Sequence, residues 1–252
     1  MPRYPSSRNP LSSFSFGPGP LTTAIKALIG ANVAIFLAQI IPAFNIFSLR
    51  YLALRPSSVL LGLRVWQVGT YMFLHAGLFH IVFNMLALWM FGTELERIWG
   101  TRYFVKFYFV SGIGAAVLTV LFSLLPFSFA RQLFDVPIVG ASGAIFGLLM
   151  AYALYFPDRP IYMYLLFPIP AKVFVAIMGA LAFYAALEGG GGVAAATHLG
   201  GLLVGYVYLK GARANPLAEV KYRYLKWKLR RVRKKFDVYS GGRADDWDRR
   251  VH

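Results

Sequence analysis

The stretch Gly140-Ala141-Ser142-Gly143-Ala144-Ile145-Phe146-Gly147 opens an apolar run that is long enough to form a membrane helix. A lone serine in such a helix is ordinarily structural, because its hydroxyl can bond back to a carbonyl one turn earlier. Two other apolar runs carry polar side chains that could meet this one: His80 with Asn84, and His198, which precedes Leu199-Gly200-Gly201. A serine, a histidine and further hydrogen-bond donors are the components of a hydrolase site.

The composition indicates a membrane protein. Of the 252 residues, 58% are hydrophobic and only 14% are charged, whereas a soluble domain carries about 25% charged residues. The absence of cysteine excludes a disulfide framework, a thiol nucleophile and a thiolate metal site. With only four histidines as well, no metal site is visible, and no cofactor is expected.

The apolar runs predict an all-α, polytopic bundle of six transmembrane helices. The expected spans are residues 25–45, 72–92, 104–125, 138–156, 171–187 and 193–209. They define three parts of the chain: a flexible cytoplasmic segment (1–24), a membrane domain (25–210) and a basic cytoplasmic tail (211–252). From Lys210 onward there are 14 Lys or Arg against 5 Asp or Glu. Beside a membrane domain, this excess favours contact with anionic lipid over nucleic acid.

The loop charges predict an orientation. With both termini inside, the inner side holds eight Lys or Arg outside the tail and the outer side holds four, which agrees with the positive-inside rule. Spans two, four and six then run from outside to inside. Their polar residues, His80 with Asn84, Ser142 and His198, fall at a similar depth, a turn or two below the outer surface. The shared depth favours one common site.

A serine hydroxyl needs a base to take its proton, and His198 is the obvious choice because His75 and His80 both belong to span two or its entrance. The sequence offers no well-placed carboxylate as a third member. Glu188 precedes four glycines in an outer loop and is a weak alternative, so a Ser–His dyad is the simpler interpretation.

Acyl transfer also needs donors for the developing oxyanion. His80 and Asn84 are four residues apart and share one helix face. The backbone N–H of Ser142 is a further donor if this residue begins a helix. The G-x-x-x-G spacing of Gly201 and Gly205 would bring span six against Gly143 and Gly147 of span four, as a Ser142–His198 hydrogen bond requires.

These residues resemble the signature of the rhomboid intramembrane serine proteases. The similarity rests on Gly140-x-Ser142-Gly143-x-x-x-Gly147, on His80-x-x-x-Asn84 and on His198-Leu199-Gly200-Gly201 with Gly205, in the order and on the spans where the family has them. It implies that Ser142 is the nucleophile and His198 the base, with His80, Asn84 and the Ser142 amide as oxyanion hole. The implied activity is endoproteolysis of single-span membrane proteins near the outer membrane face.

The resemblance also assigns roles to residues around the site. Residues 46–71 match a loop that lies partly in the outer leaflet. Trp66-Gln67 stands there in place of the family's usual Trp-Arg, and Phe146 replaces a tyrosine that stacks on the base. His75 is interpreted as a loop or water contact. Glu96 matches a carboxylate that ties helix ends together.

Two other functions remain open: a catalytically inactive relative that binds transmembrane clients, and a small transporter. The first typically lacks the serine or the histidine, both of which this chain keeps. The second usually places its site near the bilayer centre on broken helices. Six spans without a large added domain resemble the bacterial members most, which predicts a bacterial inner membrane.

Overall fold

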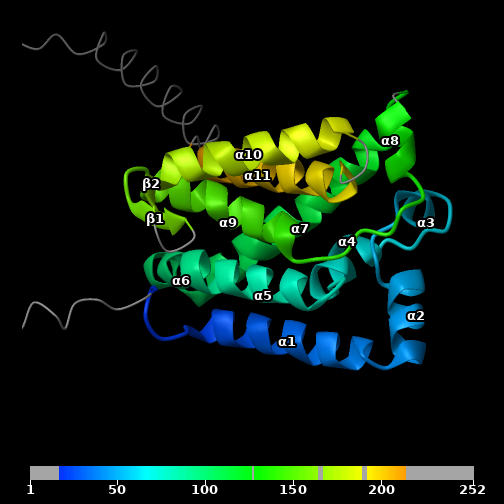
Figure 1. The fold of residues 1–252 in the computed structure, drawn as a ribbon, viewed down its shortest axis with the longest axis horizontal. Coiled ribbons are helices and arrows are strands. Elements are labelled where there is room, and N and C mark those ends of the chain that lie inside the picture. The colour runs from blue at the N-terminus through cyan, green and yellow to red at the C-terminus, as the bar shows by residue number, and fades with distance from the viewer. Residues whose placement is uncertain (1–16, 127, 164–166, 189–191, 214–252) are drawn as a thin grey trace, which may run out of the picture. The chain divides into compact units, whose positions relative to one another are not determined.

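The computed structural model describes residues 17–126, 128–163, 167–188 and 192–213, and the described chain is mostly helical (Figure 1). The protein divides into two compact units, Met1–Leu209 and Lys210–His252. The first unit contains nearly all of the predicted membrane domain. The predicted basic tail lies outside the described residues from position 214 onward.

The helices follow one another with short connections. In chain order they are α1 (Thr23–Gln39), α2 (Pro42–Tyr51), α3 (Pro56–Leu60), α4 (Gln67–Thr70), the 3-10 turn η2 (Tyr71–Phe73), α5 (Leu78–Ala87), the π-helical turn η3 (Leu88–Gly92), α6 (Thr93–Trp99), α7 (Thr101–Phe122), α8 (Ser128–Leu133), α9 (Ser142–Tyr155), α10 (Ala171–Glu188) and α11 (Gly192–Arg213). An antiparallel hairpin of β1 (Pro160–Met163) and β2 (Phe167–Pro170) joins α9 to α10.

Each of the six predicted spans contains a helix, but only some helices are long enough to cross a bilayer. Among the described residues, Leu78–Trp99 and α7 are each long and apolar enough, and α1 with α2 qualifies only if the bent pair is counted as one span. These helices support an integral membrane protein of the all-α class. The six separate crossings stay a prediction.

Two predicted spans differ from the structure for identifiable reasons. The first, 25–45, breaks after Gln39, and the chain bends by 117° between α1 and α2. Ile41 precedes Pro42 and is extended, as the steric demand of a proline ring requires of the residue before it. The second, 72–92, begins its helix only at Leu78, because the backbone is extended at Leu74 and at Gly77.

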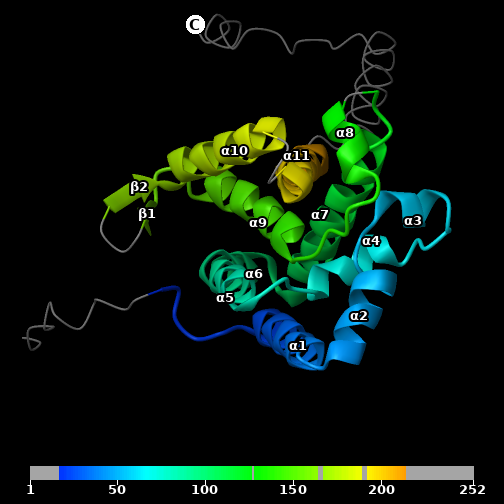
Figure 2. The same ribbon diagram turned by 45° about the vertical axis from the view of Figure 1, so that its right-hand side comes forward.

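Helix α9 lies at the centre of the bundle. Most of its side chains are buried, and α7, α10 and η3 pack around it (Figure 2). Its 14 residues span about 21 Å, less than the roughly 30 Å of a hydrocarbon core. Because α9 is enclosed by protein, a short helix can hold a polar group here without exposing its ends to lipid.

Glu96 ties the N-terminal end of α1 to the connection between α6 and α7. Its carboxylate accepts hydrogen bonds from the backbone N–H groups of Ala24 (2.9 Å) and Ile25 (3.2 Å). It also accepts from the hydroxyls of Thr22 and Thr101. The carboxylate thus caps a helix N-terminus, where negative charge is favourable. The structural role predicted for Glu96 is confirmed.

The loop between α2 and α4 is braced by the amide of Gln67. This fully buried side chain donates from Nε2 to the carbonyl of Tyr51 (3.3 Å) and accepts at Oε1 from the N–H of Arg55 (3.2 Å). Trp66 adds a second bond to the Tyr51 carbonyl through Nε1 (2.8 Å). An amide can both donate and accept, so Gln67 joins the two sides of the loop without a buried charge.

Candidate active site

Ser142 is the first residue of α9, where N–H groups have no partner within the helix. The segment before it is held in an extended form: Leu54 and Ile138 exchange two backbone hydrogen bonds of 3.0 and 2.8 Å. Gly140 donates to the carbonyl of Tyr71 (3.0 Å) and has a φ of 124°, a conformation that suits glycine. These contacts set the point at which the chain turns into α9.

The structure brings Ser142 and His198 together across α9 and α11, with 2.8 Å between Oγ and Nε2. Four glycines that the sequence predicts to bring α9 and α11 together lie beside this contact, and we call them the glycine seam: Gly143, Gly147, Gly201 and Gly205. A β-carbon on Gly201 would overlap the carbonyl oxygen of Gly143, and one on Gly205 would lie 2.9 Å from Cα of Gly147. The two backbones therefore pack as closely as the four-residue spacing predicts.

The ring of Phe146 stacks on the imidazole of His198. Their centroids are 4.2 Å apart and their planes differ by 3°. The predicted stacking is confirmed, so the phenyl ring fixes the plane of the imidazole while the hydroxyl of Ser142 fixes its direction.

His80 lies beside the serine with its donor nitrogen facing the site. Its Nδ1 accepts from the N–H of Ala76 (3.3 Å), so in the neutral ring the proton belongs on Nε2. That Nε2 lies 2.8 Å from the place where a β-carbon on Gly140 would stand, and the same place is 3.5 Å from Oγ of Ser142. The geometry leaves an N–H donor of His80 near the hydroxyl of Ser142.

Asn84 is buried one turn further along α5, but its amide turns back to its own helix. Nδ2 donates to the carbonyl of His80 (2.7 Å). Within the described residues, no hydrogen bond joins Asn84 to Ser142 or His198. His80 and Asn84 are one turn apart on α5, as their spacing predicts. One of the two N–H groups of the Asn84 side-chain amide is used in the bond to the His80 carbonyl.

Comparison with known proteins decides the family. Residues 62–214 match the Rhomboid domain family. This chain belongs to the rhomboid family. Rhomboid protein 1, mitochondrial, of Saccharomyces cerevisiae is 35% identical over 186 residues, which cover 73% of this chain and 51% of that protein. Rhomboid protease AarA of Providencia stuartii is 31% identical over 60% of this chain and 56% of its own length. Rhomboid protease GluP of Bacillus subtilis is 41% identical over 34% of this chain and 15% of its own length.

The matched part of this rhomboid chain spans about half the length of the yeast protein and of AarA, and 15% of the length of GluP. Several relatives are named as mitochondrial. The prediction of a bacterial inner membrane is therefore not supported. The comparisons and the apolar helices do support an integral membrane protein of the rhomboid family.

Sequence reasoning missed the contacts that hold α7 against the site. The hydroxyls of Thr119 and Thr197 lie 3.0 Å apart and join α7 to α11 at the residue before His198. Tyr71 donates to the carbonyl of Gly112 (2.7 Å) next to Gly143. The sequence feature that could have indicated these contacts is a hydroxyl side chain isolated in an apolar run, because a buried polar group needs a hydrogen-bond partner.

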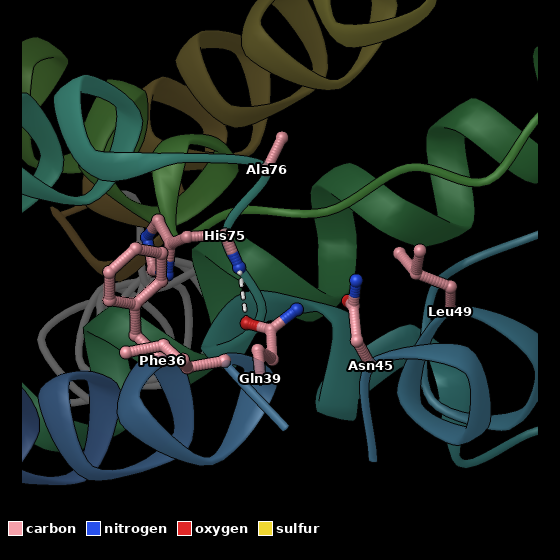
Figure 3. A pocket seen from close by; sticks show the side chains of 7 residues that line it. Phe36, Gln39, Asn45, Leu49, His75 and Ala76 are labelled. Atoms are coloured by element: carbon pink, nitrogen blue, oxygen red, sulfur yellow. Dashed lines mark hydrogen bonds between the residues drawn. The ribbon is translucent and has the colours of Figure 1, made fainter. Parts of the chain in front are cut away.

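His75 lies between the site and a separate cavity. Its ring meets that of His80 edge-on at 5.1 Å, and neither of its ring nitrogens has a hydrogen-bond partner among the described residues. The cavity, of about 280 Å³, opens between α1, α2 and the segment before α5. Figure 3 shows Gln39 and Asn45 at this cavity, with the N–H of His75 donating to Oε1 of Gln39 (3.0 Å). Neither Ser142 nor His198 lines it.

The third member considered for a triad cannot be placed, because the side chain of Glu188 lies outside the described residues. Within the described part of the chain, the hydroxyl of Ser142 is the side-chain hydrogen-bond partner of His198. No group of three or more His, Asp or Glu side chains within that part could hold a metal ion.

Proposed function

We propose that this protein is an intramembrane serine endopeptidase that cuts single-span membrane proteins near the outer membrane face. The observation that carries the proposal is the 2.8 Å contact between Oγ of Ser142 and Nε2 of His198 at the first turn of a buried helix. The names of the relatives GluP and AarA, both called rhomboid proteases, support the same reaction class.

In the first step Oγ of Ser142 attacks the scissile carbonyl while Nε2 of His198 takes its proton. For this, the neutral imidazole must carry its own proton on Nδ1. The stacked ring of Phe146 holds the plane of the imidazole, and the hydrogen bond to Ser142 sets the direction of Nε2. A carbon–oxygen bond forms, and the carbonyl π electrons move onto the oxygen to give the tetrahedral oxyanion.

The oxyanion is stabilised by the backbone N–H of Ser142 and by the Nε2–H of His80. Both belong to rigid helices, and His80 is held in its donor tautomer by the N–H of Ala76. Preorganised donors of this kind cost no reorganisation when the charge develops. The second N–H of Asn84 is the third proposed donor.

The intermediate collapses when the carbon–nitrogen bond breaks and the imidazolium of His198 returns its proton to the leaving amine. Water then attacks the acyl-enzyme with His198 again as base, releases the new carboxyl end and restores Ser142. No step requires a metal or a cofactor.

The test compares the purified protein with Ser142→Ala and with Ser111→Ala in lipid vesicles. Ser111 is a matched control, because its buried hydroxyl has no hydrogen-bond partner among the described residues. Each variant receives a single-span substrate with a small residue near its outer helix end, and mass spectrometry reads the products. A serine-directed phosphonate is applied in parallel.

Cleavage and labelling at residue 142 by wild type and Ser111→Ala, both lost in Ser142→Ala, would support the proposal. A well-folded wild type that neither cuts nor takes the phosphonate would overturn it in favour of a client-binding relative. Phosphonate labelling without cleavage would support the serine centre and refute the substrate class tested.

A further inference from the structure

Helix α2 and the loop that follows it place two cations near one aromatic ring. The guanidinium carbon of Arg64 lies 4.8 Å from the ring centroid of Tyr51, and that of Arg50 lies 5.6 Å from it. The two charges are therefore within about 10 Å of each other at most. Like charges this close repel, and the repulsion strengthens near a medium of low dielectric constant. We call Arg50, Tyr51 and Arg64 the Tyr51 cluster.

Within the part of the chain that the structure describes, no acidic side chain forms an ion pair with the Tyr51 cluster. The first 93 residues of the chain contain neither Asp nor Glu. Within the described residues, the ion pairs are Arg159 with Glu94 and Lys172 with Asp158, and neither involves the cluster. An anion from outside the described chain is the group that would balance the charge.

The cluster is held in place by backbone contacts. Nη1 of Arg64 donates to the carbonyl of Arg50 (2.9 Å), which leaves the other N–H groups of this guanidinium for a ligand. Trp66 donates to the carbonyl of Tyr51 (2.8 Å). Leu63, just before Arg64, has a φ of 53°, a strained conformation for a bulky residue. Strain held by surrounding contacts is typical of ligand-binding segments.

The surroundings of the cluster are apolar and exposed. Leu61, Leu63 and Val65 are 77%, 74% and 62% exposed, and Phe47 and Trp66 are about half exposed. A soluble surface rarely presents so many neighbouring apolar side chains. At a membrane interface they would enter the acyl region, which sets the arginines at the level of the lipid phosphates.

We propose that the Tyr51 cluster binds the phosphate of an anionic phospholipid from the leaflet into which this loop dips. The guanidinium groups donate to the phosphate oxygens, and the exposed leucines and valine contact the acyl chains. This site is distinct from the Ser142–His198 pair, and the proposal does not depend on proteolytic activity.

The test uses the full-length protein in phosphatidylcholine vesicles that contain a photoactivatable phosphatidylglycerol. After illumination, pepsin digestion and mass spectrometry locate the lipid adducts. The variant Arg50→Gln/Arg64→Gln is compared with Arg55→Gln/Arg131→Gln, which removes the same charge from the residue before α3 and from α8. The basic tail is unchanged in both, so its own lipid contacts cancel.

Adducts on residues 46–66 are expected in wild type and in the charge-matched control. Because each cation near a membrane surface is worth about five-fold in binding, Arg50→Gln/Arg64→Gln should lose these adducts by about ten-fold or more. If the double variant fails to fold, the single variant Arg50→Gln takes its place, because Arg50 is exposed and its replacement should be tolerated. The single variant should lose about five-fold of the adducts.

Each of three labelling patterns would overturn the proposal: wild-type adducts absent from residues 46–66, an equal loss in the charge-matched control, or equal labelling by a photoactivatable phosphatidylcholine. A competition experiment provides a fourth test. Free glycerol phosphate supplies the same oxygens without acyl chains. If excess soluble glycerol phosphate removes the loop adducts, the ligand is a soluble phosphate and the lipid assignment is wrong. Persistence of the adducts supports the lipid.

Discussion

Replacing Gly201 with alanine should disable the site by separating α11 from α9. The added methyl would overlap the carbonyl oxygen of Gly143, stand 3.0 Å from its carbonyl carbon and press on Cβ of Phe146 at 3.3 Å. Two of these neighbours are backbone atoms in a helix, which cannot rotate away. The helices must therefore move apart.

The size of the movement follows from the contact. The backbones must separate by about 1 Å or more before the methyl reaches 3.0 Å, below which real β-carbons are essentially never found. His198 stands one turn before Gly201 on α11, so its 2.8 Å bond to Ser142 lengthens beyond hydrogen-bond range. A displacement near 1 Å costs about 100-fold in rate. Overpacking costs about 1–3 kcal/mol of stability.

The assay is the second-order rate of phosphonate labelling at Ser142, with thermal unfolding measured on the same samples. Gly205→Ala, whose methyl would lie 2.9 Å from Cα of Gly147, should show a smaller loss. Gly30→Ala is the matched control, because a β-carbon there meets nothing within 4 Å. If Gly201→Ala labels as fast as Gly30→Ala while folded, the seam does not set the geometry of the site.

Three further substitutions test single contacts. His80→Ala should slow cleavage by about 100- to 1,000-fold through loss of an oxyanion donor; a rate equal to wild type would contradict the role. Phe146→Tyr should keep the ring stack on His198 and most of the activity, whereas Phe146→Ala should lower kcat more than ten-fold, read from initial rates of substrate cleavage. Glu96→Gln should lower stability by about 1–3 kcal/mol, because an amide cannot accept all the hydrogen bonds of the carboxylate; unchanged thermal unfolding would refute this.

The sequence predicted the parts of the site that depend on helix periodicity. The four-residue spacing of the glycines in α9 and α11 required close backbones, and the structure has them. Because His198 and Gly201 are one turn apart, close packing at the glycine also brings the histidine to α9. The stack of Phe146 on His198 follows from the same register, since Phe146 is one turn after Ser142.

Features that depend on irregular backbone were not predictable in the same way. The late start of α5 arises from extended residues at Leu74 and Gly77, which hydrophobic periodicity does not detect. The donor tautomer of His80 depends on the N–H of Ala76 in that same irregular segment. The local bond of Asn84 to the His80 carbonyl depends on the side-chain conformation of Asn84, which sequence spacing does not decide.

A buried aromatic ring can replace the third member of a triad for a physical reason. An orienting carboxylate inside a membrane protein would have to be desolvated, which costs several kcal/mol unless the charge is fully paired. Orientation needs only that the imidazole plane and one ring direction are fixed. In this protein the ring of Phe146 lies within 3° of parallel to the imidazole, and the hydroxyl of Ser142 fixes the direction of Nε2. Both constraints come from groups on α9, so the helix that carries the proposed nucleophile also aligns the proposed base.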